Sequence, residues 1–212
     1  MAASGEFVSE SERVTRQLRD DILDGVRKPG SKLVERDLAA HMGVSRVPVR
    51  DALRVLVAEG LVTPRPRTWA VVREFTSSDI ADLNEVRGAL EALTFRLAAQ
   101  RRNRAGLDRL RANLDEELKA ARAGDAVRAH RAAADFHETV TSMAANELLS
   151  ELASTFSSRM RWLLGQHDDL MAIAREHEAL YAAIVDRDVV LVEELVVVHL
   201  ENSRHAIATH SK

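Results

Sequence analysis

The sequence predicts a mostly α-helical protein of two domains, and three observations lead to this prediction. With 212 residues, the chain is long enough to build two separate hydrophobic cores. Helix formers such as Ala, Leu, Arg and Glu dominate, whereas aromatic residues make up only 4% of the chain. The spacing of apolar residues is helical nearly throughout and changes to a strand pattern only around residues 61–72. We expect a disordered tail over residues 1–9, a first domain over 10–75 and a second domain over 76–212.

The first domain begins with three helices, which are expected over residues 10–25, 33–42 and 45–59. Gly43 can adopt the positive φ that ends one helix and redirects the chain. Ser45 then occupies an N-cap position, and Pro48 falls in the first turn of the third helix. Two short helices joined by such a turn form a helix-turn-helix.

The third helix carries a cationic stripe that is separate from its apolar face. Val49 and Leu53 share one face, while Arg46, Arg50 and Arg54 follow one another at intervals of four residues on another. Guanidinium groups presented from a helix suit the DNA major groove, where Arg bonds guanine bidentately or clamps phosphate. An ordinary solvated helix surface is the alternative interpretation.

The net charge of −3 argues against a nucleic-acid binder only when it is averaged over the whole chain. Several arginines of the first domain crowd the stretch after Gly43, at Arg46, Arg50, Arg54, Arg65, Arg67 and Arg73. A local basic patch is enough for one domain of an acidic protein to bind duplex DNA.

A two-stranded hairpin is expected directly after the third helix. Residues 61–63 and 69–72 have the pattern of strands, and residues 64–68 form a basic tip between them. A hairpin that follows a recognition-type helix is the wing of a winged helix-turn-helix, and an ordinary surface hairpin is the alternative.

The second domain is helical almost without interruption. Six helices are expected, over residues 78–101, 104–123, 125–144, 146–165, 168–187 and 188–209. Helices of this length, separated by short breaks, make an all-α antiparallel bundle.

The chain contains no cysteine, no signal peptide and no apolar run of about eighteen residues. We therefore expect no disulfide and no membrane partner, and the composition fits a cytoplasmic protein.

Both domains resemble a known family. Four stretches of the first domain resemble, in order and spacing, the winged helix of GntR-family transcriptional regulators: Arg27-Lys28-Pro29-Gly30, Leu33 to Ala39, Gly43 to Leu53, and Glu59-Gly60-Leu61-Val62. The remainder resembles the ligand-sensing FCD domain of the FadR-like branch, in the pieces Asp82 to Arg87 with Glu91, Phe136-His137, Asn146 to Leu149, Glu176-His177, and His199.

The resemblance implies contacts with operator DNA from both parts of the winged helix. The contacting residues would be Arg36, Ser45, Arg46, Val47 and Arg50 in the helix-turn-helix, and Arg67 and Thr68 at the wing tip. The family usually has Gly near the wing tip, where this chain has Thr68-Trp69. A Cβ and an indole at that point alter how closely the backbone can approach the minor groove.

The resemblance also implies one divalent transition metal, such as Zn²⁺ or Ni²⁺, held by His137, His177 and His199. Metal-binding members usually carry Asp four residues before the first of these histidines, where this chain has Ala133. Asp135 is no substitute, because a step of two residues turns it about 200° away from His137. Without a metal, the three histidines would form a polar pocket.

A small carboxylate-like effector is the expected ligand of the bundle. By the resemblance, Arg87 faces the cavity, and Asn146 is expected there with it. From the residues alone, Arg87 could instead pair with Glu91 on the helix surface. Met160, Arg161 and Trp162 are candidates for shaping the cavity, and the remaining histidines of this domain are expected at the surface, namely His130, His167, His205 and His210.

These features predict a DNA-binding transcriptional regulator that is not an enzyme. A homodimer would bind an inverted-repeat operator, because a two-fold protein matches a two-fold site, and an organic acid would change its affinity. One alternative is a constitutive DNA-binding protein whose bundle serves only for dimerisation. The other is a metal-dependent hydrolase, although no general base stands at motif spacing.

Overall fold

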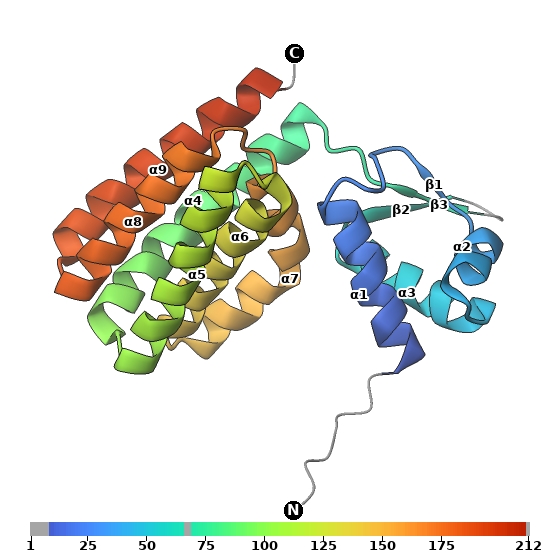
Figure 1. Ribbon diagram of the computed structural model, residues 1–212, viewed down its shortest axis with the longest axis horizontal. Helices are drawn as coiled ribbons and strands as arrows, with labels where there is room; N and C mark the ends of the chain where they lie inside the picture. The colour runs from blue at the N-terminus through green and yellow to red at the C-terminus, as the bar shows by residue number, and fades with distance from the viewer. Residues whose placement is uncertain (1–8, 66–68, 211–212) are drawn as a thin grey trace, which may run out of the picture. The chain divides into compact units, whose positions relative to one another are not determined.

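The computed structural model describes residues 9–65 and 69–210, and only the backbone of Trp69 and of residues 206–210. The chain divides into two compact units, Met1–Glu74 and Phe75–Lys212. Most described residues are helical, and the strands form one small sheet (Figure 1), so the predicted mostly α architecture is confirmed. None of the described helices is both long and apolar enough to cross a bilayer.

The first unit contains the helices α1 (Glu10–Leu23), α2 (Glu35–Met42) and α3 (Arg46–Ala58). Ser9 and Glu12 form a capping box that satisfies free N–H groups at the start of α1. α1 packs against α3, and Val14 and Leu18 of α1 are fully buried together with Leu56 of α3. This packing leaves another face of α3 open to solvent.

The turn between α2 and α3 depends on the backbone conformation of Gly43. Its φ of 66° lies in the left-handed region that glycine enters without strain. A Cβ at this position would meet no atom within 4 Å, so backbone conformation rather than space favours glycine. Ser45 is the N-cap of α3 as predicted, but its side chain makes no capping hydrogen bond.

The sheet contains the predicted antiparallel hairpin and, beside it, a third strand that was not predicted. Its strands are β1 (Lys32–Leu33), β2 (Val62–Arg65) and β3 (Trp69–Val72), antiparallel and in the order β1-β3-β2. Leu33, which was expected to begin a helix, is fully buried and pairs with Ala70 of β3. Val34 remains extended as the N-cap, so α2 begins only at Glu35.

The second unit consists of six helices whose bounds lie close to the predicted ones: α4 (Ser77–Arg101), α5 (Arg104–Ala123), α6 (Ala126–Met143), α7 (Glu147–Leu164), α8 (Leu170–Asp186) and α9 (Val189–His210). Thr76 and Asp79 form a capping box at the start of α4. Gly124 ends α5 in the left-handed conformation, as a helix C-terminus commonly requires.

Five of these helices share one hydrophobic core, with α5 packed on α6 and α8, and α4 packed on α9 (Figure 1). Phe95, Leu114, Phe136, Leu180 and Val196 are buried members of this core, one from each helix. The remaining helix, α7, packs against α4 and α6 through smaller apolar clusters. α7 lies outside the main core and, together with α4 and α6, lines a cavity that is described below.

Candidate functional site

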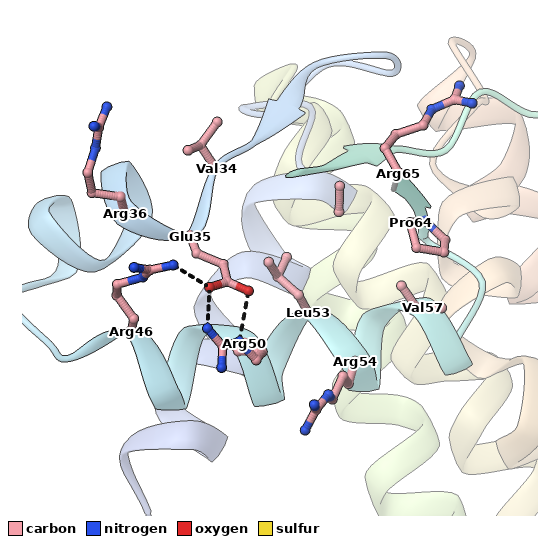
Figure 2. A pocket seen from close by; sticks show the side chains of 11 residues that line it. Val34, Glu35, Arg36, Arg46, Arg50, Leu53, Arg54, Val57, Pro64 and Arg65 are labelled. Atoms are coloured by element: carbon pink, nitrogen blue, oxygen red, sulfur yellow. Dashed lines mark hydrogen bonds and ion pairs between the residues drawn. The ribbon is translucent and has the colours of Figure 1, made fainter. Parts of the chain in front are cut away.

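A groove of about 750 Å³, here called the arginine groove, is lined by residues of α2, α3, β2 and β3 (Figure 2). Its arginines are Arg36, Arg46, Arg50, Arg54 and Arg65. The side chains of the three arginines on α3 are 62%, 47% and 73% exposed, in chain order. The predicted cationic stripe of the third helix is thus a solvent-accessible wall of this groove.

The carboxylate of Glu35 lies between two of these arginines (Figure 2). It accepts hydrogen bonds from Nε and Nη2 of Arg50 at 3.0 and 2.9 Å, and from Nη2 of Arg46 at 3.3 Å. The hydrogen bond with Arg50 lowers the pKa of Glu35, although partial burial opposes this effect. Glu35 therefore stays ionised near neutral pH and holds both guanidinium groups on one side of the groove.

Sequence reasoning missed Glu35. It stands outside any helical spacing with the arginines, and only the turn at Gly43 brings α2 beside α3. The acidic residue at the first position of a helix was the available signal, but that position favours carboxylates for reasons of capping alone.

Of the other predicted DNA contacts, some are exposed on α2 and α3, and those at the wing tip lie outside the described residues. Val47 is 62% exposed at the start of α3, beside Arg46. Arg36 is exposed at the start of α2, where its Nε lies 3.0 Å from a carboxylate oxygen of Asp37. Arg67 and Thr68 lie outside the described residues, and Arg65 is the arginine of the hairpin found in the groove.

The three predicted histidines converge in the second unit. His137 of α6, His177 of α8 and His199 of α9 are buried, and one nitrogen of each lies within 4.8 Å of the others. The ring of Phe136 stacks on His177 with centroids 4.5 Å apart, which fixes the plane of that imidazole. We call these three residues the histidine cluster.

Each ring of the histidine cluster has a carboxylate at its Nδ1 atom. Nδ1 of His177 lies 2.8 and 2.9 Å from the two oxygens of Glu117, and Nδ1 of His199 lies 2.7 Å from Glu176. Nδ1 of His137 lies 3.0 Å from Oε1 of Glu91. An ionised carboxylate can only accept, so Nδ1 of His177 and Nδ1 of His199 carry the proton and their Nε2 atoms are acceptors, whereas Nδ1 of His137 is buried without a hydrogen bond.

This arrangement suits a metal ion. The Nε2 atoms of His137 and His177 lie 3.2 Å apart, close enough to bind one ion together. Burial lowers the pKa of His137 although Glu91 raises it, and burial followed by the charge of His177 lowers that of His199. Neutral imidazoles whose second nitrogen is held by a carboxylate are the usual ligands of divalent transition metals.

The structure places the residue that stands where the family usually has its Asp ligand. Ala133 is buried on α6 and has no donor atom. Asp135 points away from the cluster, as predicted, and one of its oxygens accepts a hydrogen bond from Nη2 of Arg161 at 2.5 Å. Among the side chains that the structure describes, over residues 9–65 and 70–205, the potential metal-binding group found here consists of the three histidines alone.

A cavity of about 320 Å³, here called the bundle cavity, is lined by α4, α6 and α7 and reaches the cluster at His137. Arg87 of α4 lines it and is almost fully buried. Its guanidinium donates to Oγ of Ser203 at 2.5 Å and lies 3.0 Å from Nε2 of His199. Its Nε lies 3.1 Å from Glu91, so Arg87 lines the cavity and also pairs with Glu91, and this pair is buried rather than on the helix surface.

The charge state of Glu91 follows from these neighbours. Burial opposes its ionisation, but the charge of Arg87 outweighs burial and holds the pKa of Glu91 well below its usual value. Its Oε2 atom is buried without a hydrogen-bond partner, so the cavity has an acceptor still to be satisfied.

Some of the residues expected at the cavity lie elsewhere in this domain. Asn146 is the N-cap of α7, where its side chain accepts a hydrogen bond from the backbone N–H of Leu149 at 3.2 Å, and it does not line the bundle cavity. Met160 and Arg161 do line the cavity, whereas Trp162 stacks on Phe75 with ring centroids 4.0 Å apart.

His167, expected at the surface, is buried. Its Nε2 lies 3.0 Å from Oγ of Ser203, and its carbonyl oxygen lies 2.8 Å from Nε2 of the half-buried His130. His205 is exposed as expected, and the side chain of His210 lies outside the described residues.

Comparison with known proteins covers both units. Residues 10–72 match the family model of bacterial regulatory proteins of the gntR family, and residues 82–202 match that of the FCD domain. The chain is 30% identical to the HTH-type transcriptional regulator LutR of Bacillus subtilis over 206 residues, which cover 85% of this chain and 93% of LutR. It is 31% identical to the gluconate operon transcriptional repressor of Bacillus licheniformis, over 84% of this chain and 78% of that protein.

The fold has solved counterparts. E. coli McbR/YncC superposes with a TM-score of 0.85 at 22% identity, over 97% of this chain and all of that one. A putative GntR regulator from Rhodococcus sp. RHA1 superposes with a TM-score of 0.80 at 25% identity, over 94% and 97% of the two chains. Because the named relatives are regulators, the hydrolase alternative is excluded. The chain therefore belongs to the gntR family of bacterial regulatory proteins and is a DNA-binding transcriptional regulator with an FCD domain.

Proposed function

We propose that the chain binds an inverted-repeat operator as a homodimer, with α3 of each protomer in the major groove. The observation that carries this proposal is the arginine groove, whose exposed Arg46 and Arg50 stand at the start of α3. Ser45, Val47 and Arg36 would contact the same DNA segment, and Arg67 and Thr68 of the wing would reach the minor groove. A protein with this partner acts in the cytoplasm.

Dimerisation has support in the second unit. α9 exposes Val190, Val197 and Val198, which are 67%, 54% and 50% accessible. Large exposed apolar residues grouped on one helix suit burial against another protein. A second copy of this chain is the partner that a two-fold operator requires.

The second unit would act as the sensor. His137, His177 and His199 would hold one divalent transition metal such as Zn²⁺ or Ni²⁺ through their Nε2 atoms, leaving open positions in the coordination shell. A small organic acid in the bundle cavity would place its carboxylate at these open positions and beside Arg87. Asn146 would act only through its capping of α7.

The test uses the full chain and an operator selected from a random duplex library. Elemental analysis should find about one transition metal per chain, and His177→Ala should lose it while the exposed-site control His205→Ala keeps it. Operator affinity should change when an organic acid is added. Affinity that no acid changes would favour the constitutive alternative, and a metal-free protein that takes up no zinc would contradict the metal site.

A further inference from the structure

Arg87 contacts two residues of α9 that stand one helical turn apart. Its Nη1 atom donates to Oγ of Ser203 at 2.5 Å, and its Nη2 atom lies 3.0 Å from Nε2 of His199. Residues separated by four positions share one face of a helix, and α9 packs against α4, which carries Arg87 (Figure 1). The side chain of Arg87 is fully buried, so both contacts are shielded from water.

The direction of the hydrogen bond between Arg87 and His199 follows from the chemistry of the two groups. A guanidinium group can only donate, so Nε2 of His199 accepts through its lone pair. The proton of this imidazole is then on Nδ1, which lies 2.7 Å from the carboxylate of Glu176. Arg87 and Glu176 therefore favour the same tautomer of His199.

Ser203 and Glu91 hold the guanidinium group in this position. Oγ of Ser203 accepts from Arg87, so its own proton can be donated to Nε2 of His167 at 3.0 Å. Nε of Arg87 lies 3.1 Å from Oε1 of Glu91, as an ion pair without the geometry of a hydrogen bond. Two nitrogens of Arg87 are thus bound to α9, and the third faces an acid on α4.

The lone pair that accepts from Arg87 is the one that a metal ion would need. His199 would bind the proposed metal through Nε2, because its Nδ1 atom is engaged by Glu176. One lone pair cannot accept a hydrogen bond and coordinate a metal at the same time. Coordination by all three histidines therefore requires that Arg87 give up its hydrogen bond to His199.

The replacement of the usual Asp ligand by Ala133 makes this competition matter. The potential ligands found among the described side chains are three imidazoles, which carry no negative charge when they are neutral. A metal held by fewer and uncharged ligands binds less firmly, so a hydrogen bond that opposes it has a larger share in the outcome.

We propose that Arg87 is an internal competitor of the metal: its guanidinium group blocks the coordinating nitrogen of His199, and metal binding releases it. The released Nη2–H group would remain at the bundle cavity, which Arg87 lines. An anion could then use this donor only in the metal-loaded chain, so the metal would be a condition for effector binding. This inference rests on the proposed sensor role of the second unit.

The experiment measures the zinc affinity of the full chain, first stripped of metal, by competition with a chromophoric chelator. The variant is Arg87→Lys, which keeps the positive charge but offers one nitrogen where Arg87 uses three. An ammonium group favours the ionised Glu91, one turn along α4, over a neutral imidazole. Zinc affinity should therefore rise about tenfold or more, since a hydrogen bond from a charged group contributes about this much.

The matched control is Arg96→Lys. Arg96 stands on the same helix, its side chain is 44% exposed and it lies 3.8 Å from Glu193, so zinc affinity should stay unchanged. A second background, His199→Ala, tests whether the gain acts through this histidine, because Arg87→Lys should not raise the zinc affinity of a chain without it. Arg87→Gln is measured in both backgrounds as well and replaces the lysine variant if that one fails to fold, since the cycle cancels its change of charge.

The proposal is overturned if Arg87→Lys binds zinc with the affinity of the native chain or more weakly, or if the gain persists without His199. A purely structural role of Arg87 predicts weaker binding, which is the opposite sign. Failure of the proposed metal function has a different signature. Zinc uptake by Arg87→Lys but not by the native chain would support the competition and contradict a resident metal, whereas uptake by neither chain would overturn both proposals.

Discussion

Both carboxylate oxygens of Glu117 on α5 accept a hydrogen bond from the Nδ1–H group of His177 on α8, at 2.8 and 2.9 Å. Both side chains are buried. The contact fixes the tautomer that points Nε2 into the histidine cluster. If the cluster binds a metal as proposed, its affinity would depend on Glu117, a residue that would not contact the metal.

Replacing Glu117 should weaken metal binding without removing a ligand. Glu117→Gln keeps the size of the side chain but loses the charge that makes the imidazole a better donor, so the zinc affinity should fall about 10- to 100-fold. Competition with a chromophoric chelator measures this change. Glu116→Gln is the matched control, because Glu116 is the neighbour of Glu117 on α5 and pairs with Arg128 at an exposed site. Equal zinc affinity in both variants would show that the carboxylate is dispensable.

Arg50 should contribute directly to operator binding. Arg50→Ala should weaken binding by about 1–3 kcal/mol if Arg50 contacts a base, and it should lower the salt dependence if Arg50 contacts phosphate. Fluorescence anisotropy at several salt concentrations separates the two cases. Arg16→Ala is the control, because Arg16 is an exposed arginine of α1 and its replacement removes the same charge outside the groove. Identical losses in the two variants would mean that net charge alone is responsible.

Glu35 should affect specificity more than affinity. Its carboxylate orients Arg46 and Arg50 and also competes with DNA phosphates for them. Glu35→Gln should strengthen binding to random duplex DNA by at most about 1 kcal/mol, the scale of an exposed ion pair, while the ratio of operator to random affinity falls. Asp37→Asn, which alters the exposed pair with Arg36, provides the comparison. A ratio that rises in Glu35→Gln would contradict the positioning role.

Asn146 should matter for stability and not for effector recognition. Asn146→Ala removes the acceptor for the N–H group of Leu149 and should lower the free energy of unfolding by about 1 kcal/mol. Asn146→Asp should restore most of the loss, because Asp is an equally good N-cap. Urea unfolding measures both values. Loss of effector binding in a variant of unchanged stability would instead assign Asn146 to the cavity.

Acid should destabilise the second unit through His167. Burial, followed by the charge of Arg87, lowers the pKa of His167 to about 3, whereas the unfolded residue titrates near about 6.5. Between these values only the unfolded state binds the proton. His167 should therefore lower the free energy of unfolding by about 1.4 kcal/mol for each pH unit below about 6.5.

His167→Gln should remove this part of the pH dependence, because the amide cannot titrate in that range. Urea unfolding in chelator-containing buffer between about pH 7 and 5 is the measurement, and the exposed His205→Gln is the control. A slope unchanged by His167→Gln would mean that His167 is accessible to protons in the native state.

Hydrophobic periodicity was sufficient to predict the helices, because the face that each helix buries is encoded within the helix itself. It failed at Lys32 and Leu33, which form β1. A strand of two residues is too short to show a period, and it exists only because β3 offers a free edge to pair with. The sequence likewise could not locate Asn146, since a cap and a cavity residue have the same local appearance.

The sequence by itself determined the family, the cationic stripe of α3, and the identity of Arg87 and the three histidines, because these are carried by residue type and spacing. Only the tertiary structure decided what surrounds them. Glu91, Glu117 and Glu176 stand on three different helices without any common spacing, and Glu35 reaches Arg50 across a turn. Such charges are brought together by helix packing, and packing is a property of the whole chain that no local pattern records.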